Sequence, residues 1–363
     1  MAKNIVICCD GTGNEYGGSV TNVLKLFSIL PGNSSQQISW YNPGIGTYAL
    51  PAALTSVARA VTKIMGLAFG LGITKNIADA YRYLMNTYKS GDNVFIFGFS
   101  RGAYTARALA AMIRKIGLLE YRNENLIPYA IRMFRYERDP EIYSGFRKTF
   151  SRRCNIHFLG LWDTVKSVGW IYDPLTLPFT MQNNIVSSVR HAVSIDERRC
   201  FFRQNLWGNP EGNQEVKQVW FAGTHSDVGG SYDERESGLS QIALKWMIEE
   251  ALGKGLLINV GKYSEVVPNQ ISVKNSAVLH TPPDYKAEIH ESLKGVWWIP
   301  EFLPKLFADR SDEHRRKLKI PKGERRYIQN DALLHESVQM RLDEPECDYS
   351  PENLPERYEI CQS

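Results

Sequence analysis

Val94-Phe95-Ile96-Phe97-Gly98-Phe99-Ser100-Arg101-Gly102 joins an apolar run to a Gly-x-Ser-x-Gly pattern, and an alanine-rich, helix-forming segment follows it at 103–113. A strand, a sharp turn and a helix in this order are typical of a nucleophile elbow. A serine at the tip of such a turn crowds its neighbours, so Gly98 and Gly102 would relieve the crowding. The pattern predicts Ser100 as the nucleophile of an acyl transfer. The alternative is an inert serine in a tight strand–helix turn.

Strand and helix patterns alternate over the first 250 residues or so. Apolar runs predict strands at 4–9, 38–41, 94–97, 156–162 and 216–222, and helices are predicted at 21–30, 73–89, 103–113, 185–195 and 239–252. This alternation predicts an α/β fold, a three-layer sandwich with a mostly parallel central sheet and helices on both faces.

Two segments depart from this alternation. Residues 121–153 are helical in pattern, aromatic and basic, and we expect a helical cap or lid there; the alternative is a pair of extra packing helices. After about residue 260 the sequence becomes proline-rich and irregular. We therefore expect a catalytic domain at 1–260 and an irregular C-terminal extension at 261–363 that packs on it.

Composition excludes several classes of protein. The 363 residues are 43% hydrophobic and 23% charged, with a net charge of +4, which does not indicate nucleic-acid binding. Basic residues gather at 121–153 and 310–326, either as solvated faces or as sites for anionic groups. The six cysteines show no metal or disulfide spacing. No signal peptide or membrane span is visible, so we expect a protein that is cytoplasmic as made, with a non-Sec route if it is secreted.

A serine nucleophile needs a base and a residue that orients the base. In α/β-hydrolases the order along the chain is serine, acid, histidine, each after a strand. Asp163 follows the strand predicted at 156–162, and His225 follows the one at 216–222. We therefore predict Ser100, Asp163 and His225 as the triad, with His335 as the competing base. Asp227 either orients the histidine or binds backbone.

Two further histidines are expected to be structural. His157 lies inside a predicted strand, and His191 lies inside the helix predicted at 185–195. Neither position follows the end of a strand, where a catalytic base is expected.

An oxyanion hole needs two N–H donors. One should be the backbone N–H of Arg101, the residue after the nucleophile, and the other Gly11 or Thr12, directly after the first strand. Asp10 would brace that loop through side-chain hydrogen bonds. Asp-Gly-Thr after a strand also resembles haloacid-dehalogenase phosphatases. Their nucleophilic aspartate would stand at Cys8, so the sequence argues against that interpretation.

Several blocks together resemble the type VI secretion phospholipase effector-like catalytic domain family. They are Cys9-Asp10-Gly11-Thr12-Gly13-Asn14, residues 98–107, Leu161-Trp162-Asp163-Thr164-Val165, Ser194-Ile195-Asp196-Glu197-Arg198-Arg199 and Gly223-Thr224-His225-Ser226-Asp227-Val228-Gly229-Gly230. The resemblance covers roughly 3–255, with a weaker echo at 335–338. It implies an α/β-hydrolase core with Ser100, Asp163 and His225 as the triad, and phospholipase activity of the A1 or A2 type. It also implies a delivery or immunity protein as partner if the chain is a secreted effector.

The predicted activity is ester hydrolysis through an acyl-enzyme, with no metal or organic cofactor. A lipid is the expected substrate, and residues 296–307, with Trp297, Trp298 and Phe302, have the composition of an interfacial membrane contact. The alternative for these aromatic residues is that they cover an edge of the core. The alternative functions are a carboxylesterase that does not act on membranes and a degenerate hydrolase fold that only binds.

Overall fold

The computed structural model describes residues 2–11, 20–44, 72–165, 169–170, 173–174, 177–269, 280–308 and 316–362. Within these residues, eight strands form one sheet in the order β14-β13-β10-β9-β6-β3-β1-β2, with every neighbouring pair parallel. The strands are β1 (Asn4–Cys9), β2 (Gln37–Asn42), β3 (Asn93–Phe99), β6 (Ile156–Trp162), β9 (Val186–Ser194), β10 (Glu215–Phe221), β13 (Ala332–His335) and β14 (Tyr358–Cys361).

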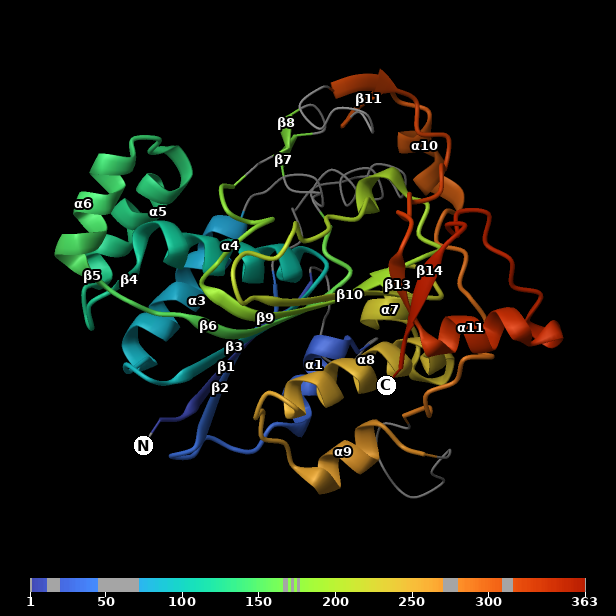
Figure 1. The fold of residues 1–363 in the computed structure, drawn as a ribbon, viewed down its shortest axis with the longest axis horizontal. Coiled ribbons are helices and arrows are strands. Elements are labelled where there is room, and N and C mark those ends of the chain that lie inside the picture. The colour runs from blue at the N-terminus through green and yellow to red at the C-terminus, as the bar shows by residue number, and fades with distance from the viewer. Residues whose placement is uncertain are drawn as a thin grey trace, which may run out of the picture.

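Helices cover both faces of this sheet, so the predicted α/β architecture is confirmed (Figure 1). Alternate residues of one strand enter different cores. Ile5 and Ile7 of β1 pack in the core that includes α3 and α4, whereas Val6 and Cys8 pack in the core that includes α1 and α8. The helices are α1 (Asn22–Ile29), α3 (Ile73–Thr87), α4 (Arg101–Ile116), α5 (Ile127–Tyr136), α6 (Pro140–Phe150), α7 (His225–Gly229), α8 (Gly238–Leu252), α9 (Val260–Val266), α10 (Trp298–Glu301) and α11 (Glu336–Asp343).

The helix predicted at 185–195 is wrong, because this segment forms strand β9. It pairs with β6 on one side and β10 on the other, and all its residues except Ser187 are buried. A central parallel strand is covered on both faces, so its sequence lacks the alternation of a half-exposed strand. The β-branched residues Val186, Val189 and Val193 favour the strand.

The chain beyond residue 260 is more regular than expected. β13 pairs with β10 and β14 pairs with β13, so this part of the chain adds two strands to the central sheet. Helix α11 contacts both of them (Figure 1). Strands from both sides of the boundary expected at residue 260 thus share one sheet. A separate antiparallel pair, β11 (Lys305–Ala308) and β12 (Arg316–Lys319), lies outside it.

The segment 121–153 is helical, as predicted, and forms α5 and α6. Lys115 donates to the carbonyl oxygens of Met133 and Phe134 in α5, and Arg147 of α6 donates to the carbonyl oxygen of Arg114. These contacts lie at the C-terminal end of α4, and Ser100 precedes its N-terminal end. A lid function for 121–153 stays a prediction.

Two further antiparallel strand pairs are separate from the central sheet. They are β4 (Leu118–Leu119) with β5 (Ser151–Arg152), and β7 (Gly169–Trp170) with β8 (Asp173–Pro174). Among the helices of the described residues, none has the length and apolar character that a membrane span requires.

Candidate active site

Ser100 occupies a sharp turn between β3 and α4. Its backbone has φ 58° and ψ −121°, a conformation that residues with a side chain rarely adopt. A Cβ on Gly98 would come within 2.6 Å of the Gly102 carbonyl oxygen, and a Cβ on Gly102 within 2.1 Å of the carbonyl oxygen of Cys9. Both glycines are therefore required by the close packing of α4 against β3 and β1, as the elbow pattern predicts.

The side chains of Ser100, His225 and Asp163 form one chain of hydrogen bonds. Ser100 follows β3, Asp163 follows β6 and His225 follows β10, so the three lie at the carboxyl edge of the parallel sheet. Nε2 of His225 lies 2.8 Å from Oγ of Ser100, and its Nδ1 lies 2.5 Å from Oδ2 of Asp163. All three residues are buried. The structure thus brings together the residues that the sequence singles out as nucleophile, base and orienting acid.

The carboxylate of Asp163 has partners that sequence reasoning did not identify. Oδ1 accepts from the Ser194 backbone N–H at 3.0 Å and from Nη1 of Arg326 at 2.5 Å, and Oδ2 accepts from Nη2 of Arg326 at 2.9 Å. Burial favours a raised pKa for Asp163, but the Arg326 guanidinium and the bond to His225 hold that pKa well below its usual range. Asp163 is therefore an ionised acceptor for the histidine.

His225 lies between two aromatic rings. Its ring centroid is 4.7 Å from that of Phe99 and 4.8 Å from that of Phe202. Burial lowers the pKa of His225, and the carboxylate of Asp163 only partly opposes this. With Asp163 accepting the Nδ1–H, the hydrogen-bond pattern assigns the lone pair of Nε2 to the Ser100 hydroxyl. This is the tautomer that a general base requires.

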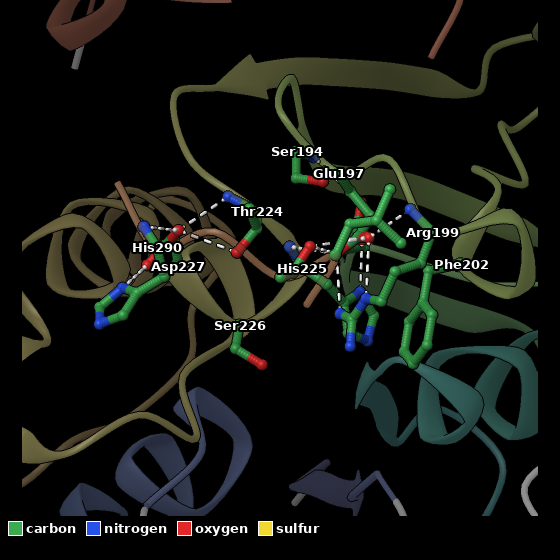
Figure 2. Close-up of polar contacts among 12 residues, drawn as sticks. Ser194, Glu197, Arg199, Phe202, Thr224, His225, Ser226, Asp227 and His290 are labelled. Atoms are coloured by element: carbon green, nitrogen blue, oxygen red, sulfur yellow. Dashed lines mark hydrogen bonds and ion pairs between the residues drawn. The ribbon is translucent and has the colours of Figure 1, made fainter. Parts of the chain in front are cut away.

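Glu197 is a second buried acid beside the histidine. Its carboxylate accepts from the backbone N–H of His225 at 3.2 Å and from Arg199 at 2.8 Å (Figure 2). It also accepts from the Ser292 hydroxyl at 3.1 Å. Burial opposes the charge of Glu197, but Arg199 lowers its pKa below the usual range. In the sequence, residues 194–199 form one block of the family resemblance, and no role is predicted for them. In the structure, the Glu197 carboxylate accepts from the backbone N–H of the candidate base, His225.

Asp227 supports α7 and does not orient the histidine. Its Oδ2 accepts from the Thr224 backbone N–H at 2.8 Å and from the Thr224 hydroxyl at 2.9 Å, which forms a capping box at the start of the helix. Oδ1 lies 2.6 Å from Nδ1 of His290 (Figure 2). Of the two roles considered for Asp227, backbone binding is therefore the one observed.

His335 and His191 have structural partners of their own. His335 is the N-cap of α11, and its Nδ1 accepts from the Ser337 backbone N–H at 3.2 Å. His191 lies in strand β9, not in a helix as predicted, and its Nε2 accepts from the Thr164 backbone N–H at 3.1 Å. The imidazole that meets the Ser100 hydroxyl belongs to His225.

The predicted oxyanion donors lie at the start of α4 and after β1. Arg101 opens α4, where the first backbone N–H groups have no acceptor within the helix. The Gly11 N–H donates to Oδ1 of Asp10 at 2.6 Å, and Asp10 also accepts from the hydroxyl of Thr21. Asp10 thus binds Gly11 and Thr21, which lie on either side of residues 12–19, and the Gly11 N–H is engaged by it. Thr12 lies outside the described residues.

A serine hydroxyl bonded to a neutral imidazole, which is bonded in turn to an ionised carboxylate, can perform nucleophilic acyl transfer. The helix N-terminus after Ser100 supplies positive potential where a negative oxygen would form. These groups suit attack on a carbonyl carbon.

Comparison with known proteins gives three likenesses. An uncharacterised protein of Saccharomyces cerevisiae, YEL023C, is 41% identical over an alignment of 221 residues that covers 56% of this chain; the chain spans about a third of that protein's length (32%). An uncharacterised protein from Pseudomonas aeruginosa has a similar structure at 20% identity and a TM-score of 0.42, covering 71% of this chain and 47% of that one. The Tle1 effector bound to the VgrG spike of the Type 6 secretion system matches at 20% identity and a TM-score of 0.39, covering 66% and 52%.

A family model covers most of the chain, including all of the strands that carry Ser100, Asp163 and His225. The model is described as T6SS, Phospholipase effector Tle1-like, catalytic domain, and it matches residues 3–250. The chain belongs to this family.

Proposed function

We propose that the protein is a serine hydrolase that cleaves carboxylic esters through an acyl-enzyme. The observation that carries the proposal is the hydrogen-bonded chain from Ser100 through His225 to Asp163 at the carboxyl edge of the sheet. Membership of a phospholipase effector family supports hydrolysis of lipids.

The proposed reaction has two steps. Nε2 of His225 takes the Ser100 proton while Oγ attacks the ester carbonyl carbon, and the imidazolium then protonates the leaving alcohol as the carbon–oxygen bond breaks. In the second step, His225 takes a proton from water, the resulting hydroxide attacks the acyl carbon, and the proton returns to Ser100 as the acid leaves. The backbone N–H of Arg101, at the start of α4, would bind the negative oxygen in each step, and Thr12 stays the second donor expected from the sequence.

A lipid substrate is supported by an exposed apolar surface close to the site. We call this surface, formed by Val296, Ile299, Phe302 and Leu303, the apolar rim; Phe302 is 59% exposed and Ile299 53%. The neighbouring residue Trp297 packs edge-on against Phe202, whose ring contacts His225. A series of ring contacts, from Trp297 to Phe202 to His225, therefore connects the segment that carries the rim with the proposed catalytic histidine.

In the membrane contact that we propose, the exposed residues are neighbours of the two tryptophans and not the tryptophans themselves. Trp297 and Trp298 are partly buried, with Trp297 against Phe202 and Trp298 against Phe302. Phe302 and its neighbours Ile299 and Leu303 carry the exposed apolar area. We propose that these three residues enter the headgroup region of a bilayer while the tryptophans hold them in place.

Partners other than lipid follow from the family. The Tle1 effector is bound to the VgrG spike in its own structure. If this chain acts as a secreted effector, a spike protein of the VgrG kind is the proposed delivery partner. An immunity protein would then bind it in the producing cell.

The test is hydrolysis of a phospholipid panel in mixed micelles by the wild-type protein and by Ser100→Ala. We expect fatty-acid release by the wild-type protein and a loss of about 10⁴-fold or more in the variant. Release from short soluble esters but not from phospholipids would favour a carboxylesterase that does not act on membranes. No turnover of either class would favour a binding module.

A further inference from the structure

We propose that Arg326 is a positioning residue of the active site, which holds the carboxylate of Asp163 in the orientation that receives the His225 N–H. This inference rests on the serine hydrolase function proposed above. Arg326 lies beyond residue 250, where the family match ends, so it adds the C-terminal part of the chain to the site.

The carboxylate of Asp163 has hydrogen-bond partners at all of its acceptor sites. A carboxylate offers about four lone-pair sites. On Asp163 they are filled by the Ser194 N–H and Nη1 of Arg326 at Oδ1, and by Nη2 of Arg326 and Nδ1 of His225 at Oδ2. Arg326 thus supplies two of the four partners, one on each oxygen. Because a forked contact to both oxygens resists rotation of the carboxylate plane, Arg326 fixes the direction in which Oδ2 faces the histidine.

Arg326 is itself held in place by further hydrogen bonds. Its guanidinium donates to the carbonyl oxygen and the hydroxyl of Ser194, at 3.1 and 2.8 Å, and to the carbonyl oxygen of Phe202. Its own carbonyl oxygen accepts from Asn353 at 3.0 Å. Arg326 is 1% exposed. The residue therefore ties the backbone of 194–202 and the C-terminal chain to the carboxylate of Asp163.

The positive charge of Arg326 also bears on the protonation of His225. A buried cation beside Asp163 stabilises the ionised carboxylate and disfavours a second positive charge on His225. Burial and the charge of Arg199 lower the pKa of His225, while two carboxylates, Asp163 and Glu197, raise it. Because Arg326 and His225 share Oδ2 of Asp163, we propose that the Arg326 charge adds to the effect of Arg199 and helps keep His225 neutral at lower pH. A residue that only filled space would support the fold without this effect on the pH dependence of the reaction.

The experiment compares Arg326→Gln and Arg326→Lys with the wild-type protein, using a soluble ester such as p-nitrophenyl butyrate. For Arg326→Gln we expect kcat to fall about 10- to 100-fold with KM nearly unchanged, the range found when a hydrogen-bond partner that orients a metal-binding residue is lost. We also expect the acid limb of the kcat/KM profile to move to higher pH, since the cation is gone. Arg326→Lys keeps the charge but not the fork, so its kcat should fall while its acid limb stays close to that of the wild-type protein.

The matched control is Arg190→Gln. Arg190 is also a buried arginine, in β9, and pairs with two carboxylates, Glu250 and Glu215, outside the site. Circular dichroism and thermal unfolding of each variant give its folded fraction. We expect Arg190→Gln to lose stability while its folded molecules keep the wild-type kcat and acid limb.

A folded Arg326→Gln variant that keeps the wild-type kcat or the wild-type acid limb would overturn the proposal. If Arg326→Gln does not fold, Arg326→Lys decides: a tenfold or larger loss of kcat at unchanged KM supports the proposal, and a wild-type kcat overturns it. If the wild-type protein neither hydrolyses the ester nor takes up an active-site label, the proposed function fails and this inference falls with it. If the wild-type protein is active and only the Arg326 variants are unaffected, the role of Arg326 alone is wrong.

Discussion

The Cα of Gly102 faces the carbonyl oxygen of Cys9 so closely that a Cβ there would come within 2.1 Å of it. Gly102→Ala must therefore displace α4 from β1, and we expect it to cost about 3 kcal/mol or more in the free energy of unfolding. Urea unfolding measures this cost. The control is Gly145→Ala in α6, which has open space around it and should be neutral or stabilising by up to about 1 kcal/mol. Equal stabilities of the two variants would contradict this description of the elbow.

The backbone of Ser100 predicts a conflict between stability and activity. Its φ of 58° with ψ of −121° suits glycine far better than serine. We expect Ser100→Gly to be about 1 kcal/mol more stable than Ser100→Ala, while both are inactive. Both variants lose the hydrogen bond to His225, so the alanine variant separates that loss from the relief of strain. Thermal unfolding measures the difference, and a glycine variant no more stable than the alanine variant would argue against strain at this position.

His290 predicts a dependence of stability on pH. It lies against the carboxylates of Asp227 and Glu236 and stacks on Tyr232. The bond to Asp227, opposed by burial and aided by Glu236, raises the pKa of His290 above its ordinary value of about 6.5. The stabilisation is therefore fully present below about pH 6.5 and is lost as the pH rises through the raised pKa.

The variant His290→Gln tests this dependence by urea unfolding at pH 5.5 and pH 9. We expect it to be less stable than the wild-type protein at pH 5.5, with a smaller difference at pH 9. A difference that is constant, or larger at pH 9, would show that the charge of His290 does not stabilise α7.

The sequence is enough to predict the parts of the site that come from local patterns. Gly98, Ser100 and Gly102 form one short motif, and Asp163 and His225 each follow a recognisable strand. Arg326 could not be predicted, because its contact with Asp163 joins residues 163 positions apart in the chain and no local pattern marks it.

The predicted fold is wrong in two places, at β9 and in the strands beyond residue 260. The sequence of β9 does not predict a strand, because both faces of this strand are buried. Its residues therefore lack the alternation of apolar and polar side chains that marks a half-exposed strand. β13 and β14 have four residues each and lie in the proline-rich, irregular part of the chain, where no alternation of strands and helices marks them.

The apolar rim predicts binding to membranes. Replacing Phe302 and Leu303 together by serine removes exposed apolar side chains, and we expect binding to anionic vesicles to weaken about tenfold or more. Turnover of a soluble ester should not change, because neither residue is among the partners of Ser100, His225 or Asp163. The control is Val260→Ser, since Val260 is 71% exposed and lies in α9, at the opposite side of the molecule in Figure 1. Vesicle sedimentation measures both, and equal binding by the rim variant and the wild-type protein would contradict a role in lipid contact.

We propose Ser100 as a nucleophile that His225 activates. The most direct measurement is labelling by a fluorophosphonate probe, followed by peptide mass spectrometry to locate the modified residue. We predict covalent label on Ser100 in the wild-type protein, none in Ser100→Ala, and labelling at least about 100-fold slower in His225→Ala. A folded wild-type protein that stays unlabelled, or that carries the label on another residue, would contradict the assignment of Ser100.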